Sequence, residues 1–105
     1  MCSSDLLAAL GTCQEITYRA FATALGIPLD GVSVAVEGDI DFRGFFAIDP
    51  TVRPGFGALR VNVTLDSAAP QADIDRLVAM VNSHCPVLDM LSSPVPATLQ
   101  TVVRR

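Results

Sequence analysis

The segment from Ser3 or Ser4 to Leu25 constrains the fold most strongly, because it predicts one long helix. Apolar residues recur along it at helical spacing. Ser4 suits the N-cap position, and Gly26 and Pro28 follow as stop signals. The predicted apolar face consists of Leu6, Leu10, Cys13, Ile16 or Thr17, Ala20 and Ala24.

The rest of the sequence alternates between strand and helix patterns. Residues 32–40 and 58–65 alternate apolar with polar side chains, which is typical of half-buried strands. A helical stripe follows Pro70 and runs to about Asn82, and Cys85-Pro86 opens a short helical turn to about Leu91. Residues 95–103 predict a last strand, at a sheet edge because of the prolines beside it. The order helix, strand, strand, helix, strand predicts a single α+β domain over residues 1–105, with the long helix packed on an antiparallel sheet.

The chain is rich in apolar residues for its size. Half of its 105 residues are hydrophobic and its mean hydropathy is +0.46. Its apolar runs are all shorter than the roughly 18 residues that span a bilayer, so we expect no membrane contact. The start, Met-Cys-Ser-Ser-Asp, lacks the basic region of a secretory signal. We therefore expect the surplus apolar surface to be buried against another copy, in an obligate homodimer or higher oligomer.

Charge and cysteine content narrow the functional classes. The net charge is −4, from 7 basic and 11 acidic residues, and the arginines are scattered. This argues against nucleic acid binding, which needs a clustered basic face. Three cysteines without a secretory signal indicate a reducing, cytoplasmic setting. An odd count also excludes a fully paired set of structural disulfides within one chain.

Cys85 and Cys13 are the candidate reactive residues. Cys85 precedes Pro86 at a predicted helix start, where backbone N–H groups favour a thiolate, although Cys-Pro is also an ordinary structural junction. Cys13 lies on the apolar face of the first helix, where a small core residue is the plainer interpretation. No neighbour in sequence activates it, although Gly11 allows close approach of another backbone or of a substrate.

Other candidates carry weaker signals. His84 precedes Cys85 and either assists its thiolate or is a solvated helix-end residue. Cys2 has no partner that its spacing identifies. The cysteines and His84 lack a known ligand spacing, so we expect no metal. Phe42, Phe45 and Phe46 form either a substrate-facing wall or a loop packed on a neighbouring subunit.

Three motifs resemble the OsmC/Ohr family of organic hydroperoxide reductases. Leu-Leu-Ala-Ala-Leu-Gly-Thr-Cys at 6–13 resembles the family's central helix. Val-x-Val-Glu-Gly-Asp at 34–39 resembles the strand that follows. Cys-Pro-Val at 85–87, with Pro-Val-Pro at 94–96, resembles the second cysteine motif. The resemblance covers nearly the whole chain.

The resemblance implies a thiol peroxidase of oxidative-stress defence. Cys13 would attack an organic hydroperoxide and become a sulfenic acid, and Cys85 would condense with it to a disulfide. An external dithiol, such as a dihydrolipoyl group, would then reduce that disulfide, with no bound cofactor. The resemblance also implies an intertwined homodimer with its active sites at the subunit interface.

The sequence departs from the family in its activating residues. The family's N-terminal β-meander supplies an arginine that stabilises the peroxidatic thiolate, and a glutamate at the helix start orients that arginine. This sequence begins almost at the helix, none of its arginines matches the motif, and Ser3 or Ser4 stands near the glutamate position. The alternative function is therefore a non-catalytic or redox-sensing domain, which could bind a small apolar ligand at the dimer interface.

Overall fold

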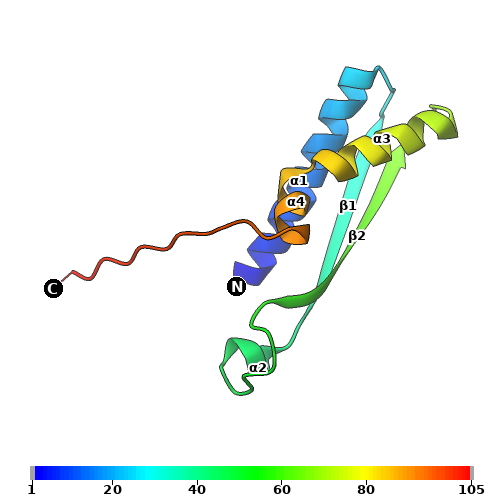
Figure 1. Ribbon diagram of the computed structural model, residues 1–105. Coiled ribbons are helices and arrows are strands. Elements are labelled where there is room, and N and C mark those ends of the chain that lie inside the picture. Colours follow the sequence, from blue (N-terminus) through cyan, green and yellow to red (C-terminus); the bar gives the residue numbers. More distant parts are fainter. Residues whose placement is uncertain (1, 105) are drawn as a thin grey trace.

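The computed structural model describes residues 2–104, with side chains from Asp5 onward. Four helices and one two-stranded antiparallel sheet make an α+β fold (Figure 1). The predictions for the side chains of Cys2, Ser3 and Ser4 lie outside the described residues. The elements in chain order are α1 (Cys2–Leu25), β1 (Gly31–Ile40), α2 (Phe42–Phe45), β2 (Phe56–Asp66), α3 (Gln71–His84) and α4 (Pro86–Ser92).

β1 and β2 form a hairpin whose two faces follow the predicted alternation. Val34 pairs with Val63, and Val36 pairs with Val61, so the apolar side chains share one face. On the other face Arg60 lies opposite Glu37 and binds it and the diagonal neighbour Asp39. The apolar face is only half-buried along its whole length. The helices of one chain therefore leave part of the sheet uncovered.

α1 lies against β1, and α3 and α4 pack on α1 (Figure 1). Gly11 faces the sheet, where a Cβ atom would lie 3.4 Å from Cγ2 of Val36, an ordinary van der Waals contact. The approach of α1 to the sheet at this position therefore does not require glycine. The fully buried core is small and lies where the second half of α1 meets α3. Its cluster consists of Tyr18, Ala22, Ile27, Leu77 and Val81.

The buried face of α1 is rotated from the predicted one. Leu10 and Thr17 are buried as expected, but Ala20 and Ala24 are exposed. Ile16, offered as the alternative to Thr17, is 62% exposed. The error has a simple cause, because alanines on both sides of the helix give a weak periodic signal. The structure places Gln14 and Tyr18, which were not in the predicted face, on the buried side.

The prediction of a strand at 95–103 was wrong. In the part of the chain that the structure describes, residues 93–104 belong to no helix or strand. Pro94 and Pro96 remove two backbone donors, and the segment runs away from the body of the molecule, out of reach of both free sheet edges (Figure 1). An alternating pattern becomes a strand only where it finds a partner. The sheet consequently has two strands and not the three predicted.

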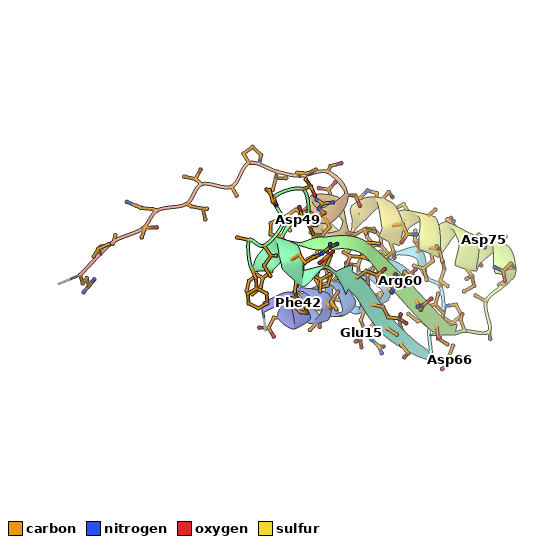
Figure 2. All side chains as sticks on the ribbon, turned by 90° about the horizontal axis from the view of Figure 1, so that it is seen from below. Glu15, Phe42, Asp49, Arg60, Asp66 and Asp75 are labelled. Carbon is orange, nitrogen blue, oxygen red and sulfur yellow. The ribbon has the colours of Figure 1, made fainter. Side chains whose placement is uncertain are left out.

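The loop between the strands carries an exposed aromatic cluster. The rings of Phe42, Phe45 and Phe46 contact one another, with centroids 4.9 to 6.4 Å apart. All three are exposed, as is Ile48 beside them. Figure 2 shows Phe42 at one end of the hairpin and Asp66 at the other. Among the described helices, none combines the length and the apolar character that crossing a membrane requires.

Candidate functional site

Cys13 and Cys85 lie in contact although 72 positions separate them in the chain. The Cys85 thiol donates a hydrogen bond to Sγ of Cys13 at 3.3 Å. Both are free cysteines, of which Cys13 is partly exposed and Cys85 is 1% exposed. Two sulfurs at this separation need only a small movement to form a bond. The site is therefore a dithiol with one accessible member and one buried member.

The backbone around Cys85 fixes the buried thiol. Its N–H donates to the Val81 carbonyl at 2.9 Å and closes α3, while its own carbonyl accepts from the Asp89 N–H at 3.0 Å and opens α4. Between the helices Cys85 is extended, with φ −69° and ψ 115°. Pro86 suits the first position of α4, where no N–H is needed. The junction therefore holds its sulfur against α1.

The environment of Cys85 favours its thiolate. Burial raises the pKa of the Cys85 thiol and is the largest single effect. Hydrogen bonding to the Leu88 N–H and to Cys13 acts in the opposite direction, as does the nearby Gln14 side chain, with a smaller effect from the Val87 N–H. Together these donors outweigh burial, so the pKa lies below that of an ordinary cysteine. This stabilisation comes from neutral donors.

Among the described contacts, none places an arginine side chain at the two sulfurs. The described ion pairs of Arg19, Arg43 and Arg60 are with carboxylates on the surface. No hydrogen bond or ion pair in residues 5–104 joins an arginine to either sulfur. His84 is exposed and its Nδ1 lies 2.9 Å from the Met80 carbonyl, while its ring lies beside Phe21. Its described contacts are thus with its own helix and with α1.

Gln14 is a site residue that sequence reasoning missed. It is 2% exposed, follows Cys13 on α1 and contacts Cys85 closely enough to affect its ionisation. Its Nε2 nevertheless makes no hydrogen bond of ordinary geometry, and no other described side-chain donor or acceptor is buried in this way. An unsatisfied buried donor costs about 1–3 kcal/mol. The sequence did hold a signal, because Gln14 lies four residues after Leu10 and four before Tyr18.

A pocket of about 550 Å³ lies between α1, α3, α4 and β2, and neither cysteine is among the residues that line it. Gln14 and Leu88, both neighbours of Cys85, belong to its wall, and the rest of the wall is mostly apolar. Groups of three or more residues that could hold a metal ion do not occur among the described side chains. The remaining residues that line the pocket are Tyr18, Val61, Val63, Leu65, Val78 and Asn82.

The fold and the site define an α+β protein with a dithiol between its central helix and a helix junction. A model of the family described as OsmC-like protein matches residues 4–100, and the chain belongs to this family. It is similar in structure to an OsmC-like protein from Mycoplasma pneumoniae, with a TM-score of 0.74 and 19% identity. The match covers 86% of this chain and 60% of that one, so the chain spans less than two thirds of that relative's length. A search of curated proteins found no match. At this identity the structural likeness shows a shared fold.

Proposed function

We propose that this protein reduces organic hydroperoxides with its dithiol. Cys13 is the nucleophile, because it is the accessible thiol, while Cys85 is 1% exposed. The Cys13 thiolate attacks one peroxide oxygen, the O–O bond breaks, and the products are a sulfenic acid and, after protonation, an alcohol. The observation that supports this most is the 3.3 Å contact between the two sulfurs.

Cys85 then resolves the sulfenic acid. Its thiolate attacks the Cys13 sulfur, the S–S bond forms, the S–O bond breaks, and hydroxide leaves as water after taking a proton. A lowered pKa suits this role, because the attacking sulfur must be ionised. An external dithiol, such as a dihydrolipoyl group, completes the cycle by exchange and becomes a disulfide itself.

A second candidate function is redox sensing without efficient turnover. The observation that favours it is the lack of a described contact between an arginine and either thiol, since such a cation is what the family uses for activation. Under this alternative the dithiol oxidises slowly and the disulfide changes the α1–α4 contact. The two candidates differ in rate and share the same pair of cysteines.

We also propose that the working unit is a homodimer, with the half-buried sheet face and the aromatic loop as the surfaces it covers. The apolar face of β1 and β2 is nowhere fully buried within one chain. Such surface is normally removed from water in oligomers. A dimer would also shelter the pocket that Gln14 and Leu88 line.

The test is a free-thiol count before and after one equivalent of cumene hydroperoxide. We expect rapid loss of two thiols per chain, and Cys13→Ser should abolish peroxide consumption. Cys85→Ser should consume peroxide once and retain a sulfenic acid that dimedone traps. Cys2→Ser is the matched control and should behave as the parent protein. Slow loss that depends on Cys2 would contradict the proposal, and slow loss confined to Cys13 and Cys85 would favour sensing.

A further inference from the structure

Gln14 is a buried amide whose place on α1 has no structural explanation in the described contacts. It lies on the helix face that packs against α3 and α4, between the buried residues Leu10 and Tyr18. An apolar residue would fill this position without leaving a donor unpaired. Its Nε2 is the one described buried side-chain atom of its kind without a hydrogen-bond partner. A donor held in this way is suited to an acceptor that exists only in another state of the protein.

The Cys85 sulfur is a group on this side of α1 that changes its ionisation state during the proposed reaction. Gln14 follows Cys13, whose Sγ lies 3.3 Å from that of Cys85, and it lines the same pocket as Leu88 of α4. Gln14 and Cys85 are both almost fully buried. The Cys85 proton is directed at Cys13 in the thiol form. Once Cys85 ionises, its sulfur becomes a charged acceptor, and hydrogen bonds to charged groups are stronger than those between neutral ones. The unpaired amide and the buried sulfur thus complement each other in the thiolate state.

We propose that the Gln14 carboxamide donates a hydrogen bond to the Cys85 thiolate and is a catalytic residue of the resolving step. This inference rests on the proposed peroxidase function for its role in turnover. Gln14 stabilises the thiolate before it attacks the Cys13 sulfenic acid. It stabilises the same thiolate again when Cys85 leaves during reduction of the disulfide by an external dithiol. It takes no proton and carries no charge, so it assists both directions of exchange.

Other titratable groups around Cys85 are few in the described chain. From α1 it meets Cys13. His84 precedes it at the end of α3, and Asp89 of α4 contacts its carbonyl through a backbone N–H. An experiment on Gln14 must therefore remove Cys13 and hold the other two groups constant.

The first experiment measures the ionisation of Cys85 alone, from the ultraviolet absorbance of its thiolate against pH. The background is Cys2→Ser with Cys13→Ser, which leaves one thiol. Gln14→Met removes the donor at similar size and should raise the midpoint by about one pH unit. Tyr18→Phe, one turn further along the same buried face, is the matched control and should leave it unchanged. If Gln14→Met does not fold, Gln14→Leu makes the same test.

The second experiment follows one turnover with both cysteines present. Below the midpoint of Cys85, Gln14→Met should slow disulfide formation about tenfold. The rate at which Cys13 forms its sulfenic acid should be unchanged. An unchanged midpoint in a folded Gln14→Met or Gln14→Leu protein, or an equal shift in Tyr18→Phe, would overturn the role of Gln14. Failure of the parent protein to consume peroxide would overturn the proposed function instead, since the first experiment needs no peroxide.

Discussion

Cys13 and Cys85 differ in how far an external molecule can reach each sulfur. Cys13 is partly exposed, whereas the Cys85 side chain is enclosed by α1 and α4. The pKa of Cys85 also lies below that of an ordinary cysteine, and a thiol of lower pKa leaves faster from a disulfide. We therefore expect an incoming thiol to attack Cys13 and Cys85 to be the leaving group.

We predict that a monothiol added to the oxidised protein forms its mixed disulfide at Cys13. The protein, as Cys2→Ser, is oxidised with diamide, treated briefly with 2-mercaptoethanol and quenched with acid. Peptide mass spectrometry should find the adduct at Cys13 at about tenfold excess over Cys85. The same treatment in urea is the control and should weaken the preference, because both sulfurs are then accessible. A folded protein that carries the adduct mainly on Cys85 would contradict this assignment of roles.

The sequence predicted only part of the candidate site. Both cysteines stood out, because their surroundings differ so clearly along the chain. Their contact depends on how α1 crosses the α3–α4 junction, which periodicity does not encode. Gln14 was missed for another reason: a polar residue type suggests a solvated position, even where its spacing from Leu10 places it on the buried face. At Gln14 the polar residue type predicts exposure and the helical spacing predicts burial, and the structure agrees with the spacing.

At the scale of elements, α1 ends in a motif that the sequence indicated. Gly26 has φ +68°, its N–H donates to the Thr23 carbonyl, and the Ile27 N–H reaches back to the Ala22 carbonyl at 2.9 Å. This is a Schellman arrangement, in which a left-handed residue follows the helix. Ile27 and Ala22 also meet in the buried core. The two residues whose backbones close the helix therefore also belong to the buried core.

We predict that Gly26→Ala lowers the free energy of unfolding by about 1 kcal/mol. The cause is the left-handed backbone alone, because a Cβ atom at Gly26 would meet nothing within 4 Å. Gly55→Ala is the matched control, since its Cβ would also be unobstructed but its φ is not positive. Urea unfolding with an unchanged m-value measures both. Equal effects in the two variants would show that φ at Gly26 is not the cause.

The sequence predicted the elements that find their partners within the chain. α1, α3 and the hairpin follow from periodicity and from stop signals such as Gly26 and Pro28. Residues 95–103 show the same alternation as β1, yet they form no strand. Alternation reports which side chains share a face and says nothing about whether a neighbouring strand is available. That information belongs to the tertiary or quaternary structure.

The whole molecule is expanded for its length. Its radius of gyration is 17.5 Å, with extents of 56 × 29 × 22 Å. A compact domain of this length would have about 13 Å. The projecting C-terminal segment and the hairpin loop account for the difference, and both carry exposed apolar side chains (Figure 1). Leu99, at 92% exposure, is the extreme case. The proposed homodimer would remove some of these exposed side chains from water.

We predict that the protein sediments as a homodimer at micromolar concentration, and that the aromatic loop contributes to the contact. Phe45→Ser with Phe46→Ser should weaken the dimer at least about tenfold, because burying one such ring contributes about 1.5–3 kcal/mol. Neither ring packs on the core cluster, so folding by circular dichroism should be unchanged. Ile16→Ser is the matched variant on the exposed face of α1. If Ile16→Ser alone dissociates the dimer, the interface lies on α1 and not on the aromatic loop. A parent protein that sediments as a monomer would contradict the dimer altogether.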